Sequence, residues 1–186
     1  MSRAFGKIFL AAAFSLGLAS GALAEVIESG LGGFQVRQVA SLEAPLPAVR
    51  AALLNVGAWW SSDHTYSGNA ANLSMDLTSG CFCEKLKDGF VRHMTVVYAD
   101  SRTLRLWGGL GPLQTTGAAG HLAFNLAESG SGGTRLVLTY DVGGFARGGL
   151  GPVWAAPVDE VLGLQVLRLK SYVESGAKAG GPPPGH

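Results

Sequence analysis

Apolar and polar residues alternate along short segments through most of the chain between residues 34 and 142. Alternation with a period of two is typical of strands that bury one face. It predicts one strand over 34–44 and six more over NLSMDLT, CFCEKLK, VRHMTVVYAD, TLRLWG, GHLAFNLAES and TRLVLTYDV. Turn signals separate these six segments, namely Gly80, KDG, ADS and GSGG. The pattern therefore predicts seven strands, the last six joined as an antiparallel meander.

Helical spacing occurs on either side of the meander. The segment PLPAVRAALLN (45–55) has apolar residues at helical spacing, and VGAWWSS after it predicts a second short helix. A long helix is expected over 157–175, where Pro157 suits the first turn and an apolar stripe is formed by Val158, Val161, Leu162, Leu169 and Val173. A large antiparallel sheet must bury one face, and this terminal helix is the element available to cover it.

The order of these elements, the WW pair at 59–60 and the final helix PVDEVLGLQVLRLK resemble the START-like superfamily, also called SRPBCC, helix-grip or polyketide-cyclase-like. The resemblance covers about residues 33–174 and lies in pattern rather than in an invariant motif. It implies an α+β fold in which a curved seven-stranded antiparallel sheet wraps around the C-terminal helix, with two short helices after the first strand and an apolar cavity inside. Members bind or transform lipids, sterols, polyketides and plant hormones, and one branch activates a cytosolic chaperone ATPase.

The first 24 residues predict a secretory signal peptide. Arg3 and Lys7 precede the apolar run IFLAAAFSLGLA, and Ala22 and Ala24 give an A-x-A exit. We expect cleavage after Ala24, export to the periplasm or beyond, and a ligand-binding domain over 25–175. The segment 176–186 is rich in Gly and Pro and is predicted to be a disordered tail.

Charge and hydropathy limit the partners. Without Arg3 and Lys7, the 14 basic residues become 12, against 13 acidic ones. This near-neutral charge balance argues against a nucleic-acid partner. No second apolar run approaches the roughly twenty residues that cross a bilayer, so stable membrane insertion is not expected.

One set of alternate strand residues is apolar and is expected to line the concave, helix-facing side of the sheet. With residues of the helices and loops, it gives the candidate ligand contacts: Trp60, Met75, Phe82, Glu84, Arg92, Met94, Tyr98, Leu106, Leu110, Phe124, Leu138, Tyr140, Leu150, Leu162 and Leu169. Leu110 and Leu150 belong to two copies of GGLGP, at 108–112 and 148–152. Either the repeat is chance in a glycine-rich chain, or both copies form flexible flaps that expose these leucines at one mouth of the cavity.

Glu84 is the polar candidate on the apolar face, because its parity places it between Phe82 and Leu86, with Arg92 opposite or diagonal. A buried carboxylate must be paired or have a raised pKa. It is either half of a Glu84–Arg92 ion pair or an anchor for the polar head of an apolar ligand. His64 lies in the loop after the first helices and is either a group at the cavity mouth or a solvated histidine.

Cys81 and Cys83 fall on the opposite, outer parity together with His93. Alternate residues of a strand are roughly 6.5 Å apart, whereas bonded cysteines hold their Cβ atoms about 3.8 Å apart, so a disulfide would need a bulge. A three-residue KDG turn would place Cys83 opposite His93, but three ligands without a CxxC pair indicate a metal site only weakly. We expect two cysteines on the strand surface with no essential disulfide, no metal and no cofactor. A disulfide between them stays the alternative, because an oxidising compartment would favour it.

Two functions remain open on the sequence alone. The first is a binding protein that holds a small apolar molecule mainly by burial. The second is a cyclase, dehydratase or hydrolase that uses Glu84 or His64 as acid–base. We favour binding, because no pair of proton-transfer groups has a defined spacing. The signal peptide argues against a cytosolic co-chaperone.

Overall fold

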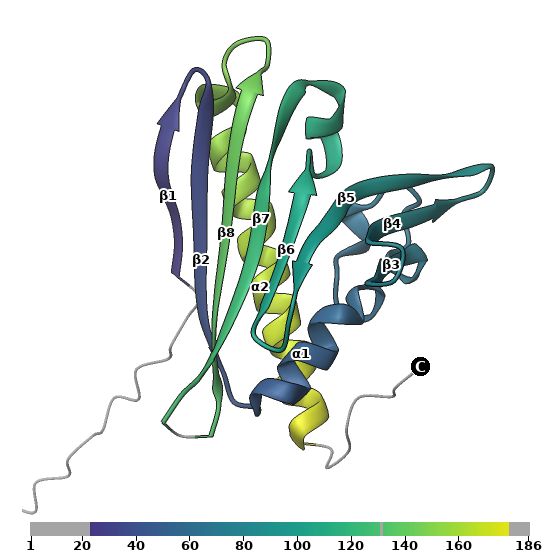
Figure 1. Ribbon diagram of the computed structural model, residues 1–186, viewed down its shortest axis with the longest axis vertical. Helices are drawn as coiled ribbons and strands as arrows, with labels where there is room; N and C mark the ends of the chain where they lie inside the picture. The colour runs from purple at the N-terminus through teal and green to yellow at the C-terminus, as the bar shows by residue number, and fades with distance from the viewer. Residues whose placement is uncertain (1–22, 131, 179–186) are drawn as a thin grey trace, which may run out of the picture.

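Eight antiparallel strands form one curled sheet in the computed structural model, which describes residues 23–130 and 132–178 (Figure 1). The strands lie in the order β1-β2-β8-β7-β6-β5-β4-β3, so β3 to β8 follow one another as the predicted meander. Their bounds are β1 (Leu23–Gly30), β2 (Gly33–Leu42), β3 (Leu73–Asp76), β4 (Cys81–Leu86), β5 (Gly89–Ala99), β6 (Thr103–Gly108), β7 (Gly117–Glu128) and β8 (Thr134–Phe145).

The predicted count of seven strands was wrong, because β1 was not recognised. β1 pairs with β2 at the edge of the sheet. Its residues from Glu25 to Gly30 are all exposed, the neighbours Val26 and Ile27 included, so this part of the strand has no alternation between buried and solvent-facing positions. β1 starts at Leu23, two residues before the expected mature N-terminus at Glu25. The rest of the predicted signal peptide, 1–22, lies outside the described residues.

Two α-helices are present in the part of the chain that the structure describes, α1 (Leu46–Leu54) and α2 (Ala156–Lys178). The helices predicted over 45–55 and 157–175 are thus confirmed, although α2 extends three residues into the segment predicted as a disordered tail. The second short helix expected at VGAWWSS is only a three-residue turn, Val56–Ala58. Single helical turns complete the loops: η1 (Val56–Ala58), η2 (Ser62–His64), η3 (Ala70–Asn72), η4 (Gly111–Thr115) and the π-helical η5 (Gly151–Ala155). None of the described helices is long and apolar enough to cross a membrane.

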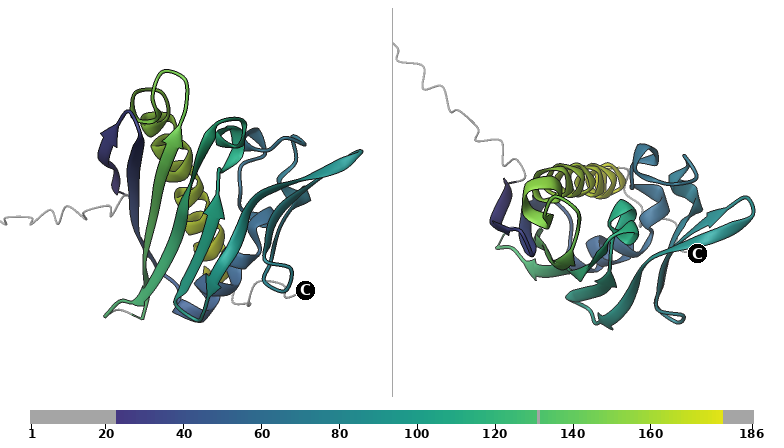
Figure 2. Two further views of the ribbon diagram at one scale, coloured as in Figure 1. Left: turned by 45° about the horizontal axis from the view of Figure 1, so that its top comes forward. Right: turned by 90° about the horizontal axis from the view of Figure 1, so that it is seen from above.

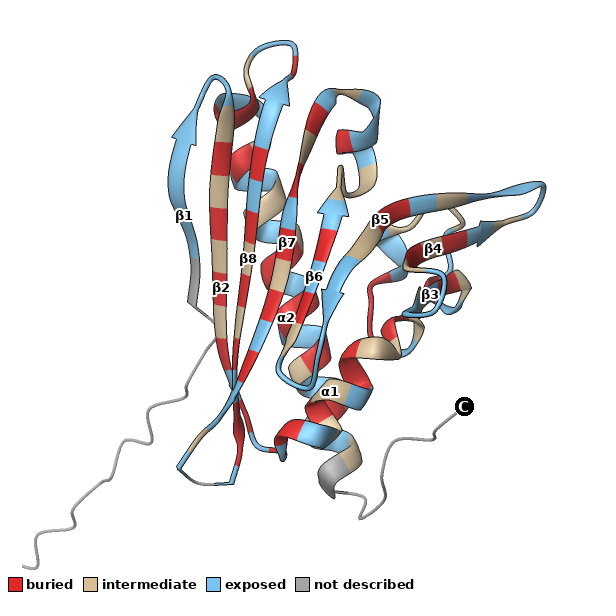
Figure 3. Cartoon of the chain, in the orientation of Figure 1, coloured by how far each residue is buried: buried red, intermediate tan, exposed pale blue. Residues whose placement is uncertain are grey.

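The sheet curls around α2, which lies along its concave side (Figure 2). Buried residues alternate with half-buried or exposed ones along β2, β7 and β8, as Figure 3 shows. The buried residues of these strands meet an apolar stripe of α2 that includes Leu162, Val166 and Leu169, each at most 1% exposed. The predicted α+β architecture of a curved sheet packed on a C-terminal helix is confirmed, with eight strands rather than seven.

The two GGLGP segments leave the same end of the sheet, after β6 and after β8 (Figure 1). Leu110 in the first copy is half-buried. Leu150 in the second is fully buried, and its backbone N–H donates to the carbonyl oxygen of Leu31 in the β1–β2 turn. Of the two alternatives for the repeat, the one with both leucines exposed on flaps is therefore wrong for Leu150, because the unrecognised hairpin of β1 and β2 anchors this segment.

Candidate functional site

A cavity of about 270 Å³ lies between α2, the sheet and the loops that follow α1 and β6. Its lining is mostly aromatic and aliphatic: Trp60, Asp63, His64, Thr65, Tyr66, Leu73, Phe82, His93, Leu110, Gly111, Pro112, Leu113, Tyr140, Trp154, Pro157, Val158, Val161 and Leu162. A dry apolar cavity of about 150 Å³ holds benzene. The space here therefore suits a molecule of about two fused rings.

Six of the predicted site residues border this cavity: Trp60, His64, Phe82, Leu110, Tyr140 and Leu162. Seven others pack in or against the hydrophobic core without lining it: Met75, Met94, Leu106, Phe124, Leu138, Leu150 and Leu169. Alternation identified the inner face of the sheet correctly, but most of that face packs directly against α2. The cavity lies only where the sheet and α2 are not in direct contact.

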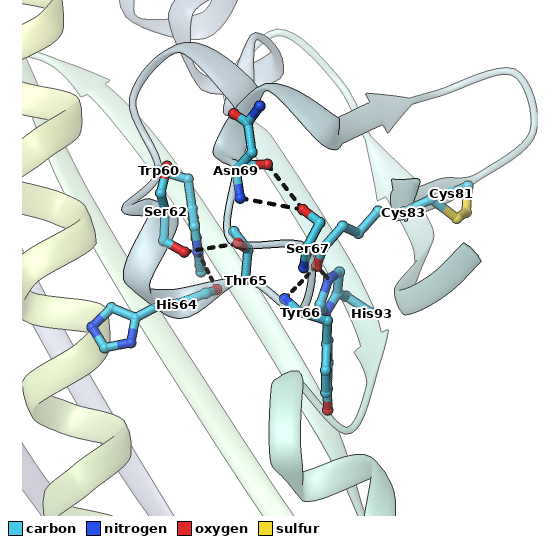
Figure 4. Close-up of polar contacts among 11 residues, drawn as sticks. Trp60, Ser62, His64, Thr65, Tyr66, Ser67, Asn69, Cys81, Cys83 and His93 are labelled. Atoms are coloured by element: carbon cyan, nitrogen blue, oxygen red, sulfur yellow. Dashed lines mark hydrogen bonds and ion pairs between the residues drawn. A yellow bond between two sulfur atoms is a disulfide. The ribbon is translucent and has the colours of Figure 1, made fainter. Parts of the chain in front are cut away.

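The segment 60–70 forms one wall and is held by its own hydrogen bonds (Figure 4). Trp60 Nε1 donates to the carbonyl oxygen of His64 at 3.1 Å, and Ser62 Oγ accepts from the N–H of Ala70 at 3.0 Å. The segment is also tied to α2, because the N–H of Ser61 donates to Oε1 of Gln165 at 2.9 Å. These contacts fix the backbone that carries His64 at the cavity border.

β5 carries one extra residue opposite β4. Phe82 faces Met94 and Cys83 faces Arg92, which leaves His93 without a partner across the strand pair. A β-bulge of this kind interrupts the alternation of side chains along the strand. His93 and Met94 are consecutive, and both are buried. The bulge thus brings His93 inside, where the regular parity had placed it on the outer face.

The predicted partner of Glu84 was wrong for the same reason. Val91, not Arg92, lies opposite Glu84, and the β4–β5 turn consists of two residues, 87–88, rather than the expected KDG. Arg92 is exposed, and its guanidinium donates to the carbonyl oxygen of Gly80 at 3.4 Å. It therefore lies outside the cavity.

Tyr98 was also placed wrongly on the cavity side. The pairing of β5 with β6 shifts between Val96 and Tyr98, which reverses the parity of the residues that follow. Tyr98 is 47% exposed, and its hydroxyl donates to Asp100 Oδ2 at 2.7 Å. Arg105 lies over its ring, 5.5 Å from the centroid. Tyr98 therefore belongs to the outer surface.

Cys81 and Cys83 form a disulfide, the alternative that the regular strand geometry had disfavoured (Figure 4). Their Cα atoms are 5.3 Å apart, closer than the roughly 6.5 Å of alternate residues in a regular strand. The shortened part of β4 lies opposite the bulge of β5, which supplies the distortion that such a bond requires. Both sulfurs are consumed by this bond, and the described residues contain no group of three or more His, Cys, Asp or Glu side chains that could hold a metal.

Glu84 is fully buried, as its parity predicted, and its carboxylate accepts three hydrogen bonds. The backbone N–H of Tyr66 donates to Oε2 at 3.1 Å, and the N–H of Ser67 donates to Oε1 at 2.5 Å. Nε2 of His93 lies 2.9 Å from Oε2. Glu84 therefore joins the wall segment 60–70 to β4 and β5, just behind the cavity lining.

The pKa values of this pair define its charge. Burial raises the pKa of Glu84, but the hydrogen bonds from Ser67, Tyr66 and His93 outweigh burial and bring it below its ordinary value. Burial lowers the pKa of His93 more than the neighbouring carboxylate raises it. At neutral pH Glu84 is thus ionised and His93 neutral. Because a carboxylate only accepts hydrogen bonds, Nε2 of His93 carries the ring proton and Nδ1 is an acceptor.

His93 is 4% exposed and lies against two aromatic rings. The ring of Tyr66 stacks on the imidazole with centroids 5.8 Å apart, and that of Phe82 lies 5.2 Å away. Its Nδ1 has no hydrogen-bond partner among the described residues. The imidazole is therefore fixed in position and tautomer, with one acceptor left unused.

Tyr140 closes another side of the cavity. Its hydroxyl donates to the carbonyl oxygen of Gly108 at 2.9 Å and accepts from the N–H of Leu110 at 3.0 Å. Burial raises the pKa of Tyr140 to about 12, so the phenol is neutral. Its hydrogen-bonding groups are engaged with the first GGLGP segment, which makes Tyr140 an anchor for that loop.

Sequence reasoning missed His93, Tyr66, Leu113 and Trp154 as residues of the cavity wall. A bulge leaves no mark in the alternating pattern of β5, so His93 was assigned to the wrong face. The other three stand on loops or single helical turns, where no periodicity exists. The only available signal was their position in polar or glycine-rich segments between regular elements.

Comparisons with known proteins identify the fold. No family model matches this sequence, and no curated protein matches it. A conserved protein of unknown function from Enterococcus faecalis superposes with a TM-score of 0.56 at 14% identity, over 89% of this chain and 82% of the other. A protein from Mycobacterium smegmatis gives 0.53 at 12% identity, over 81% and 96%, and an uncharacterized protein from Rhizobium leguminosarum gives 0.52 at 16%, over 83% and 98%. At these identities the chain shares with them a fold of a curled sheet and a C-terminal helix.

Proposed function

We propose that this chain is a START-like binding protein that holds a small, neutral, largely apolar molecule between the sheet and α2. The observation that carries the proposal is the cavity itself, about 270 Å³ with a mostly hydrocarbon lining. Removing the apolar surface of a ligand from water would drive binding. A rigid bicyclic hydrocarbon such as 2-methylnaphthalene matches this volume and tests the proposal directly.

The matched variants lie on one helix. Val161 is half-buried and borders the cavity, whereas Leu167 is 46% exposed on the same helix. We expect wild type to bind one 2-methylnaphthalene in isothermal titration calorimetry, and Val161→Trp to weaken binding by about tenfold or more by filling the space. Leu167→Trp should leave the affinity unchanged. No binding to wild type, or equal affinities for the two variants, would contradict the proposal.

Export is part of the proposal. The Cys81–Cys83 disulfide supports it, because such bonds persist in oxidising compartments. Cleavage after Ala24 would remove two residues of β1 and leave its remainder, from Glu25 to Gly30, paired with β2. N-terminal sequencing of protein from the periplasmic or extracellular fraction should start at Glu25, and recovery of Met1 there would contradict export with cleavage.

Acid–base catalysis is the second candidate function, favoured by the contact between Glu84 and His93. A neutral imidazole held by a carboxylate can remove a proton from a carbon next to a carbonyl group. His93 replaces the predicted His64 in this role, since His93 is the histidine that contacts Glu84. Hydrogen exchange at 2-tetralone in D2O, followed by NMR, should then be faster with wild type than with His93→Phe. Equal rates would exclude this activity for that substrate class.

A further inference from the structure

The wall of the cavity contains one unused polar atom. Four buried side-chain N or O atoms lack a hydrogen-bond partner among the described residues, and Nδ1 of His93 is the one that belongs to a residue lining the cavity. Buried polar groups are nearly always paired in native proteins. An unpaired acceptor beside a cavity therefore points to a donor on whatever occupies that cavity.

The chemistry of this acceptor is fixed by its surroundings. Glu84 accepts a hydrogen bond from the N–H at Nε2, so Nδ1 presents a lone pair and not an N–H. The rings of Tyr66 and Phe82 both contact the imidazole. A partner at Nδ1 must accordingly donate a hydrogen bond, as a hydroxyl group does.

The charges around the cavity exclude an anionic head group. The lining residues include Asp63 and no lysine or arginine. Ionised Glu84 lies directly behind His93, 2.9 Å from its ring nitrogen. A carboxylate or phosphate on the ligand would meet no cation there and would be repelled by Glu84. The donor must therefore be neutral.

Building on the apolar-ligand function proposed above, we propose that Nδ1 of His93 accepts a hydrogen bond from a neutral hydroxyl group on a flat apolar ligand. The site then selects phenol- or enol-type molecules over hydrocarbons of the same shape and over acids. The aromatic lining residues Trp60, Phe82 and Trp154 suit a flat ring system. Nδ1 itself is closed to water, so a neighbouring side chain has to move when the ligand enters. Tyr66 is 51% exposed and is the member of the stack that can move.

The test compares 2-naphthol with 2-methylnaphthalene, which has a methyl group in place of the hydroxyl. Dissociation constants for both are measured with wild type and with His93→Phe, which keeps an aromatic ring beside Tyr66. Because the hydrophobicity of each probe cancels in the cycle, the change in their ratio isolates the hydroxyl–His93 contact. We expect the ratio to move by about tenfold, or 1.4 kcal/mol, against 2-naphthol in the variant.

The possible outcomes distinguish failure of the hydroxyl contact from failure of the proposed apolar-ligand function. If both probes bind and the ratio stays within about twofold, the hydroxyl contact is wrong and the apolar-ligand function stands. If neither probe binds wild type, both fail. Binding of 2-naphthoate as tightly as 2-naphthol would overturn the selection against acids.

A measurement on wild type tests the same contact without relying on the folding of a variant. In 15N-labelled protein, the resonance of the unprotonated ring nitrogen of His93 should shift when 2-naphthol is added and stay in place with 2-methylnaphthalene. Assignment of the free nitrogen to Nδ1 is part of the expectation, since Glu84 holds the proton on Nε2. The same response to both probes, or a proton on Nδ1, would overturn the inference.

Discussion

Replacing Glu84 by glutamine tests whether this carboxylate holds the wall of the cavity in place. The carboxylate accepts from the N–H groups of Tyr66 and Ser67 and from Nε2 of His93, while fully buried. Glutamine offers one acceptor oxygen, and its NH2 group faces a donor. At least one charge-assisted hydrogen bond, worth about 1.5–3 kcal/mol, is lost, and a donor is left unpaired. We expect the free energy of unfolding to fall by about 2–4 kcal/mol at pH 7.

The effect should depend on pH in a defined direction. The pKa of Glu84 is lower in the folded protein than its ordinary value of about 4.3. Its ionisation therefore stabilises the fold at pH values above about 4.3, and this contribution is lost as the pH falls through the lowered folded pKa. The difference between wild type and Glu84→Gln should accordingly be largest at neutral pH and shrink in acid.

Urea unfolding followed by circular dichroism at a series of pH values measures both the free energy of unfolding and its dependence on pH. Glu160→Gln is the matched control, because Glu160 is exposed on α2. It should change the free energy of unfolding by less than about 0.5 kcal/mol. A loss this small in Glu84→Gln, or a loss that does not diminish in acid, would refute the assignment of an ionised, wall-holding carboxylate.

Three further substitutions probe the fold around the site. Leu169→Ala should reduce the free energy of unfolding by about 2–5 kcal/mol, because Leu169 is fully buried on α2; a loss below about 0.5 kcal/mol in chemical denaturation would place it outside the core. Replacing Cys81 and Cys83 by serine should lower the melting temperature by about 3–6 °C, since a three-residue loop contributes only about 1.6 kcal/mol through chain entropy. A fall of more than about 10 °C in calorimetry would contradict that reasoning. Tyr140→Phe should cost about 1–3 kcal/mol by unpairing two backbone groups, and unchanged urea stability would show that its hydroxyl does not anchor the loop.

The periodicity of apolar residues was sufficient to predict the main architecture. The meander from β3 to β8 and the stripe of α2 follow from patterns of apolar residues that the core enforces, because a misplaced face would bury polar groups. β1 lacked such a pattern, since Val26 and Ile27 are both exposed. An edge strand defined by backbone pairing alone leaves little trace in composition.

The site was predicted only in part, because bulges break the rule on which the prediction depended. One extra residue in β5 moves His93 inside and leaves Arg92 outside, and a second shift turns Tyr98 to the surface. The disulfide was judged to need such a distortion, and the distortion is present. Register shifts arise from pairing between strands, which a single sequence does not specify.

Binding of an apolar molecule between the sheet and α2 is tested most directly by an isotope-filtered NOE experiment on methyl-labelled protein with bound 2-methylnaphthalene. Leu113 and Leu162 are buried and line the cavity, whereas Leu31 is 75% exposed at the β1–β2 turn. We expect NOEs from the probe to the methyl groups of Leu113 and Leu162 and none to Leu31. NOEs to Leu31 alone, or none to either cavity leucine while the probe is bound, would contradict binding between the sheet and α2.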